Sequence, residues 1–458
     1  MRRMLRQIGC AKVGSTTLYS LLLNLTMSGR ASSETVQPDG RYRALVCLFL
    51  DGGNDSFNML APLEQKEYAR YRTARGSLAL EREKFLGITD PAGRANGRKF
   101  GVHPAMPEVR DLYNSGKLSF LCNVGTLAEP TNLAKINNYT ARLPLRLYSH
   151  ADQFMHWQTS TPETRGTIGW AGRAAEILRS VNERNDISMN ISLSGTNIFQ
   201  SGKDLIPYSI NPDGVSLLNG YNDPSRAFFR KAVDSLLEQK YQSLLRQTYA
   251  DLTRQAIDSA DIFHRVWQAT PKVQTPFPDT VMGRNLRGVA QSMAARGSLG
   301  MKRQTYFIRC AGWDHHDEVL NSQNHMLADV SRSVAAFWQA LGELGLQDDV
   351  LLFSASDFGR TLSSNGKGSD HGWGGHQFIL GGGHRGGRFF GDYPEDISLG
   401  NKLDTGRGRL IPTTSVDEYF AELALWLGVS RSDLQTVLPN IGRFYDVRSR
   451  RMPLGFFR

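Results

Sequence analysis

The sequence has little cysteine, and its cysteines are far apart. Cys10 lies near the N-terminus, and only Cys47, Cys122 and Cys310 follow it in a chain of 458 residues. This spacing fits neither a disulfide framework nor a cysteine-based zinc motif. The last three lie in or beside apolar runs, so we expect them to be buried free thiols.

Long apolar runs and a large charge excess are also missing. No run reaches the ~18 apolar residues of a membrane-spanning helix, so we expect no stable membrane span. The formal net charge is +10, from 54 Lys+Arg and 44 Asp+Glu. Residues 1–33 hold five basic groups and no acid, which leaves 49 basic and 44 acidic groups, or +5, in the other 425 residues (458 − 33). So small an excess argues against nucleic acid as a partner.

The first 33 residues have the pattern of an export signal. Arg2, Arg3 and Arg6 come first, and a weakly apolar stretch follows at 18–27. The paired arginines resemble the twin-arginine type of signal. We therefore predict a twin-arginine-type signal segment over 1–33, the twin-arginine export machinery as a partner, and a periplasmic or otherwise exported protein. The alternative is a disordered basic leader.

Short apolar runs predict buried strands, and amphipathic stretches between them predict helices. Unbroken runs suit a sheet covered on both faces, and their alternation with helices favours an α/β fold with a mostly parallel sheet. We expect a single domain over 34–458 with a helical insertion near 200–300. The predicted strands are 44–50, 118–124, 305–310, 350–354 and 378–380, and the predicted helices are 225–270 (two long helices), 321–344 and 416–427.

Aspartates and histidines recur just after the predicted strands or just before the last one. Because ligands bind at the carboxyl ends of parallel strands, we expect these side chains to converge. Carboxylates and neutral imidazoles suit one or two divalent metal ions per chain, with zinc, manganese, magnesium and calcium as the candidates. Taken singly, each aspartate can instead cap a helix or a turn. The candidate metal ligands are Asp51, Asp314, His315, His316, Asp357, His371 and His376.

Several longer strings resemble those of a known family, the bacterial domain-of-unknown-function family 1501, over almost the whole chain after the leader. They are Leu48-Phe49-Leu50-Asp51-Gly52-Gly53-Asn54-Asp55, Gly312-Trp313-Asp314-His315-His316, Ser356-Asp357-Phe358-Gly359-Arg360-Thr361 and Gly368-Ser369-Asp370-His371-Gly372-Trp373. The family resembles the alkaline phosphatase/sulfatase superfamily. The resemblance implies an alkaline-phosphatase-like three-layer sandwich, with a mostly parallel central sheet and helices on both faces.

The resemblance also implies roles for single residues. The metal ligands would be Asp51, Asp314 with His315 or His316, Asp357, and His371 or His376. Phe358 stands where the superfamily has a further histidine ligand. The superfamily's nucleophile is a Ser, Thr or modified Cys at a helix N-terminus. The candidate catalytic hydroxyls are Thr126 and Ser56, which can alternatively be helix caps, and the candidate substrate-binding residues are Asn54, Arg360 and His150.

The sequence is compatible with two functions. The first is an exported metal-dependent hydrolase of phosphate or sulfate esters, acting on a small anionic ester or glycan. The second is a non-catalytic extracytoplasmic binding or assembly protein on the same fold. The phenylalanine at position 358 and the unassigned nucleophile favour the second, and the repeated Asp and His placement favours the first.

Overall fold

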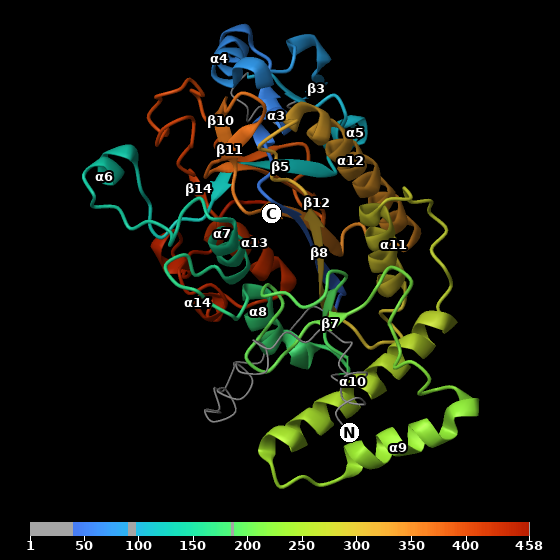
Figure 1. Cartoon of the computed structure of the whole chain (residues 1–458). Coiled ribbons are helices and arrows are strands. Elements are labelled where there is room, and N and C mark those ends of the chain that lie inside the picture. The colour runs from blue at the N-terminus through green and yellow to red at the C-terminus, as the bar shows by residue number, and fades with distance from the viewer. Residues whose placement is uncertain (1–39, 90–97, 185–186, 458) are drawn as a thin grey trace.

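A nine-stranded mixed sheet forms the centre of the molecule (Figure 1). The computed structural model describes residues 40–89, 98–184 and 187–457, so the predicted signal segment lies outside the described residues. The strand order is β13-β5-β12-β9-β1-β8-β6-β7, and β14 also pairs with β5. Every pairing is parallel except those of β12, which is antiparallel to both β5 and β9. The strands are β1 (Arg43–Asp51), β5 (Leu118–Gly125), β6 (Asn190–Ser192), β7 (Tyr208–Ser209), β8 (Arg303–Ala311), β9 (Val350–Ser356), β12 (Gly375–Gly381), β13 (Phe389–Gly391) and β14 (Thr414–Ser415).

Helices cover both faces of this sheet, which makes three layers. Strand β1 shows the arrangement, since its side chains alternate between two separate cores. Val46 and Leu48 belong to the core under one helical layer, and Cys47 and Phe49 to the core under the other. The first layer contains α5 (Pro107–Asn114), α11 (Val281–Ala294) and α12 (Val319–Glu343), and the second contains α7 (His150–Thr159), α8 (Trp170–Leu178), α13 (Val416–Leu427) and α14 (Leu434–Val437).

The predicted strands and helices are confirmed. All five predicted runs are strands of the central sheet, and the stretch 225–270 contains two helices, α9 (Ala227–Glu238) and α10 (Leu244–Ala269). These two form a hairpin that projects from the body (Figure 1). Cys47 and Cys122 are buried free thiols as expected, whereas Cys310 is only partly buried. Within the described ranges, no helix combines the length and apolarity needed to cross a membrane.

Smaller elements lie around the carboxyl end of β1. Helix α3 follows this strand directly, and a three-stranded sheet, β2-β4-β3, and a two-stranded sheet, β10-β11, lie nearby. Their bounds are α3 (Ser56–Met59), β2 (Leu60–Pro62), α4 (Gln65–Arg75), β3 (Leu86–Ile88), β4 (Phe100–Val102), β10 (Arg360–Ser364) and β11 (Ser369–His371). Helix α6 (Leu133–Asn137) lies farther out, on the segment between β5 and α7.

Candidate metal centre

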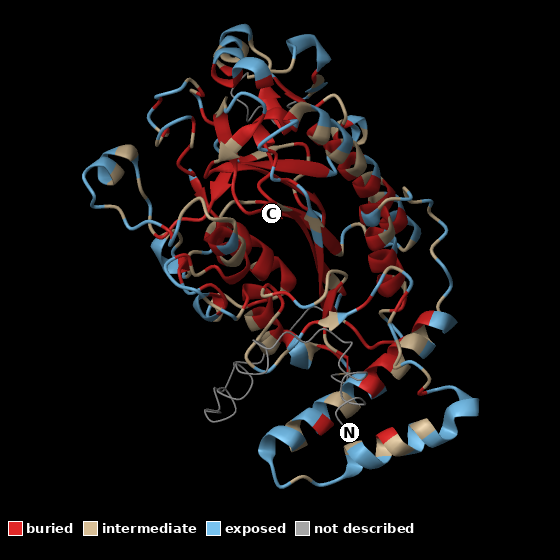
Figure 2. Cartoon of the chain, viewed as in Figure 1, coloured by how far each residue is buried: buried red, intermediate tan, exposed pale blue. Residues whose placement is uncertain are grey.

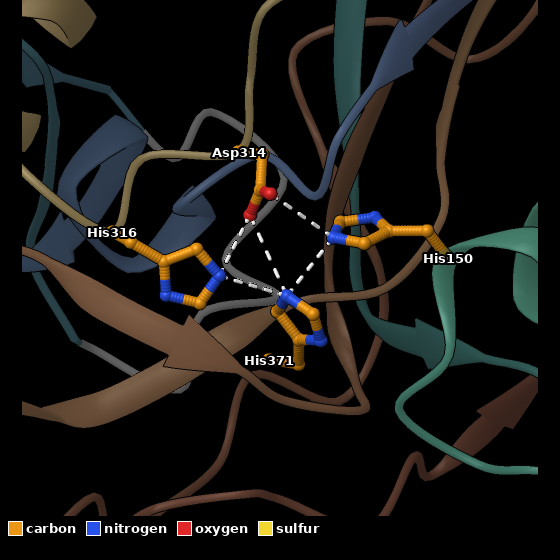
Figure 3. A group of neighbouring side chains, drawn as sticks. All are labelled: His150, Asp314, His316 and His371. Atoms are coloured by element: carbon orange, nitrogen blue, oxygen red, sulfur yellow. Dashed lines mark hydrogen bonds and ion pairs between the residues drawn. The ribbon is translucent and has the colours of Figure 1, made fainter.

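Four side chains from three separate segments converge beyond the carboxyl end of β1 (Figure 3). His150 is the first residue of α7, Asp314 and His316 lie in the loop after β8, and His371 ends β11. His371 Nε2 lies 2.9 Å from Nε2 of both His150 and His316. The Asp314 carboxylate lies 3.0 Å from His316 Nε2 and 3.3 Å from His150 Nε2. Three imidazoles and one carboxylate thus point at a common centre.

The donor set and its spacing fit a divalent ion such as zinc. With metal–ligand bonds of about 2.0–2.1 Å, the ligand atoms of a tetrahedral zinc site lie about 3.3 Å apart. One ligand atom from each of the four residues can be chosen so that all lie within 4.8 Å of one another, and the closest approaches are 2.9–3.5 Å. Among the described residues this is the only such group. The geometry supports one ion rather than two.

Each histidine is held from behind by its other ring nitrogen. His150 Nδ1 lies 2.7 Å from Asp357, His316 Nδ1 lies 3.1 Å from Asp370, and His371 Nδ1 donates to the Tyr148 carbonyl at 2.7 Å. Because a carbonyl can only accept, His371 Nδ1 carries a proton, and Nε2 of the neutral ring presents a lone pair to the group. Outer partners of this kind fix the ring and its tautomer in metal sites.

Charges around the centre keep the Asp314 carboxylate ionised. Burial raises the pKa of Asp314, but the Arg360 guanidinium, 2.7 Å away, and the neighbouring histidines leave it below its usual value. The hydrogen bond to Asp357 raises the pKa of His150. Burial lowers the pKa of His371 and raises that of Asp357. A carboxylate and a neutral His371 are the protonation states that a metal ion needs.

A glycine allows the segments to approach. Gly52, directly after β1, has φ +122°, and a Cβ atom there would lie 2.4 Å from the Asp314 backbone nitrogen. Only glycine avoids this overlap and adopts this φ easily. The Gly52 N–H also donates to Asp357 at 3.1 Å, and its carbonyl accepts from Arg360 at 3.1 Å. The turn after β1 therefore contacts both Asp357, which bonds His150, and Arg360, which bonds Asp314.

Three of the predicted ligands join the group, and the other four lie elsewhere. Asp314 and His316 both belong to the group, whereas His315 between them is buried beside Trp313. Asp357 is an outer partner of His150. Asp51 forms an ion pair with Arg309 at 2.6 Å.

His376 lies in the core rather than at the centre. Its ring stacks on Tyr393 and meets the edge of Phe57, both at 4.6 Å between ring centroids. Its Nδ1 accepts a hydrogen bond from the Asn123 backbone N–H at 3.1 Å. Burial lowers the pKa of His376 to about 3, so the ring is neutral.

The predicted hydroxyls are buried and already bonded. Thr126 donates to Gln153, and Ser56 accepts from the His376 backbone N–H at 2.8 Å. Asn54 is buried as well, and its side-chain carbonyl accepts from Gln323 at 3.3 Å. Neither hydroxyl belongs to the group of four, and none of these three side chains is open to a substrate in this arrangement.

The structure places Arg360 beside the group of four and His150 within it. Arg360 is buried and donates to Asp314 and to the carbonyls of Gly52 and Ser369, so it positions a ligand. His150 is a ligand candidate itself. Sequence reasoning did not identify Asp370 and Tyr148 as outer partners, although Asp370 is the immediate neighbour of His371.

Loss of an outer carboxylate is expected to weaken metal binding. Asp357→Asn should lower the affinity for zinc about 10–100-fold, because outer partners of metal-bound histidines contribute effects of this size. Asp370→Asn should cost less, since its side chain is 23% exposed while that of Asp357 is fully buried. Competition with a chromophoric chelator measures both affinities. Wild-type affinity in Asp357→Asn would contradict the role assigned to this carboxylate.

Comparisons with known proteins identify a family. The model of the family described as "Protein of unknown function (DUF1501)" matches residues 42–404. No curated protein matches the sequence.

Solved structures overlap only loosely with this chain. One is Ps i-CgsB in complex with k-i-k-neocarrahexaose, at 11% identity and TM-score 0.33 over 89% of this chain and 78% of that one. Another is the lipoteichoic acid synthase LtaP from Listeria monocytogenes, at 8% identity and TM-score 0.33 over 90% and 78%. A third is the C-terminal periplasmic domain of EcEptC from Escherichia coli in complex with Zn, at 9% identity and TM-score 0.35 over 86% and 84%. Overlaps at this level carry no argument about the activity of this chain.

Proposed function

The chain belongs to the DUF1501 family of proteins of unknown function, and we propose that it is a metal-dependent hydrolase of phosphate or sulfate esters. The observation that carries the proposal is the group of His150, Asp314, His316 and His371, which fits a divalent ion and stays open to solvent. Even the least exposed of the four side chains, that of His371, is 24% accessible. A purely structural ion is usually enclosed more completely.

A divalent ion at this centre would polarise an ester oxygen and offset the charge that develops on it. The protein side chains fix the geometry around it. Asp357, Asp370 and the Tyr148 carbonyl orient the three rings, and Arg360 holds Asp314. Arg309 is 51% exposed and pairs with Asp51 at the end of β1, and Arg407 is 47% exposed and pairs with Asp370, the outer partner of His316. Their guanidinium groups favour an anionic substrate such as a small ester or an anionic glycan.

Water is the nucleophile in this proposal, because Thr126 and Ser56 are buried and bonded within the protein. Water attacks the phosphorus or sulfur atom, and the ester bond to the alcohol oxygen breaks. One proton from water leaves with the alcohol, and the hydroxyl remains on the phosphate or sulfate. No covalent intermediate on the chain is required.

We further propose that the twin-arginine machinery exports the chain, which would then act in the periplasm or outside the cell. The support is Arg2, Arg3 and Arg6 ahead of the apolar stretch 18–27. Fractionation of cells that carry the Arg2→Lys/Arg3→Lys variant tests this. Retention of the variant in the cytoplasm is expected, and unchanged export would contradict it.

Binding without turnover is the second candidate. The Phe358 ring lies 4.8 Å from the His150 ring and 4.7 Å from the His371 ring. Four protein ligands also complete a tetrahedral shell, which is the pattern of structural zinc sites. Both observations favour an ion that supports the fold or binds an anion without hydrolysing it.

Turnover of aryl esters distinguishes the two candidates. The full chain, loaded with zinc or manganese, is expected to hydrolyse p-nitrophenyl phosphate or p-nitrophenyl sulfate. Chelation should remove at least about 99% of that rate, and added metal should restore it. Equal rates in the metal-free protein would contradict a metal-dependent hydrolase. Absence of turnover with metal bound would favour the binding protein.

A further inference from the structure

The α9–α10 hairpin carries an unusual share of the exposed apolar surface. Of the twelve large hydrophobic side chains exposed in the described part of the chain, six lie between residues 228 and 252. The hairpin projects from the body, and most of its outer surface is exposed (Figures 1 and 2). These six are Phe228, Leu236, Leu244, Leu245, Tyr249 and Leu252. An apolar concentration of this kind on a projecting element indicates a contact with another molecule.

Three of the six belong to a heptad seam along α10. Residues 245, 249, 252, 256, 259, 263 and 266 follow one another at alternating steps of four and three. They are Leu245, Tyr249, Leu252, Ala256, Ser259, Phe263 and Val266. This spacing keeps one stripe of the helix turned toward a partner helix, as in a coiled coil.

The seam is covered along one half only. Phe263 is buried, belongs to the main core and contacts Tyr208 at 5.4 Å between ring centroids. Leu245, Tyr249 and Leu252 are 44%, 44% and 38% exposed. Helix α9 packs elsewhere on α10, where Ile257 joins the small core with Val233. The apolar stripe that docks α10 onto the body therefore continues, uncovered, along the projecting half.

The charges of the hairpin select the kind of partner. Helix α9 has two basic and two acidic residues, and α10 has three of each when histidine is counted as neutral, so both helices are net neutral. Helices that bind anionic membranes carry a basic polar face, which is missing here. The flanks of the uncovered seam hold Thr248, Thr253 and Gln255, and Arg246 is the only charged residue among them. A second copy of the same surface meets no repulsion from like charges.

We infer that the uncovered seam of α10 pairs with the same seam of a second copy of this chain, in an antiparallel arrangement about a twofold axis. With the axis between Tyr249 and Leu252, Tyr249 of each copy lies opposite the partner's Leu252. The same register sets Leu245 opposite Ala256, a large residue against a small one. A twofold contact of this kind is self-complementary and closes as a dimer. The uncovered part of the seam is short, so we expect a weak dimer with a dissociation constant in the micromolar range.

Sedimentation equilibrium of the full chain tests the inference. A monomer–dimer equilibrium is expected between about 0.1 and about 100 μM. Leu252→Glu should weaken the dimer more than about a hundredfold, because each substitution enters the contact twice. The side chain is exposed in the monomer, so the fold should be kept, which circular dichroism checks. Phe228→Glu is the matched control, since Phe228 is 86% exposed on α9, outside the seam, and should leave the dimer unchanged.

Cysteine crosslinking tests the register. The Tyr249→Cys/Leu252→Cys variant should form an intermolecular disulfide under mild oxidation, and Asp251→Cys on the far side of the helix should not. A monomer at every concentration, or a dimer that Leu252→Glu leaves intact, would overturn the inference. Binding of the monomer to vesicles of anionic lipid through the same residues would assign the surface to a membrane instead, and would equally overturn it.

Discussion

His371→Ala is expected to abolish both metal binding and ester turnover. His371 Nε2 lies 2.9 Å from two of the other ligand atoms and 3.5 Å from the Asp314 carboxylate, so it contacts every other member of the group. The loss of an outer partner already costs about 10–100-fold in affinity, and the loss of a ligand should exceed a hundredfold. Metal analysis after dialysis and the rate on an aryl ester measure the two effects.

A matched control exists on helix α12. His325 is exposed, and its Nδ1 lies 3.0 Å from the backbone carbonyl oxygen of Asn321 in the same helix. His325→Ala should keep the metal content and the rate of the wild type. If His371→Ala also kept both, with an unchanged circular dichroism spectrum, the centre described above would not be the metal site of this protein.

Metal affinity is expected to fall steeply with decreasing pH. A protonated imidazole cannot bind a metal ion, so protons compete with the metal at each histidine. The hydrogen bond that His150 makes to the Asp357 carboxylate raises the pKa of His150 above the usual value of about 6.5. Affinity should therefore be full well above that pKa and fall about tenfold per pH unit below it. Between pH 8 and pH 5 we expect at least a ~30-fold loss, measured by competition with a chelator at each pH.

The Asp357→Asn variant shows whether this carboxylate sets the pH dependence. An asparagine at position 357 removes the negative charge that favours the His150 cation, so the pKa of His150 should drop. The pH at which affinity begins to fall should then shift to lower values, although the affinity at high pH is weaker. An unchanged midpoint in the variant, or a wild-type affinity that is independent of pH, would contradict the account.

Much of the fold could be predicted from apolar runs alone, and the reason is burial. Strands such as β1 and β9 are covered on both faces, so they appear as unbroken hydrophobic stretches. Strands β6 and β7 have only three and two residues, which is too short for a recognisable pattern. The antiparallel direction of β12 depends on how the chain returns to the sheet, which its apolar residues do not encode.

The candidate site could be predicted only in part. The strand-end rule identifies Asp314 and His316, which follow β8. His371 precedes a predicted strand instead, and it reaches the same edge of the sheet because β12 is antiparallel to its neighbours. The rule misses His150, since that residue starts a helix whose place against the sheet depends on the long path of the chain before it. The Phe358 position shows the consequence. The sequence has phenylalanine rather than histidine at this position, and the Phe358 ring packs against the His150 ring. The imidazole in this region therefore comes from His150, on a distant segment of the chain.

The central claim is that His150, Asp314, His316 and His371 hold one divalent ion. Metal analysis of the full chain, purified without chelator, tests it most directly when paired with the His150→Ala variant. The account predicts one ion per wild-type chain and fewer than about 0.1 per variant chain after the same dialysis. A folded wild type that holds no ion after incubation with zinc and manganese, or a variant that still holds one, would contradict it.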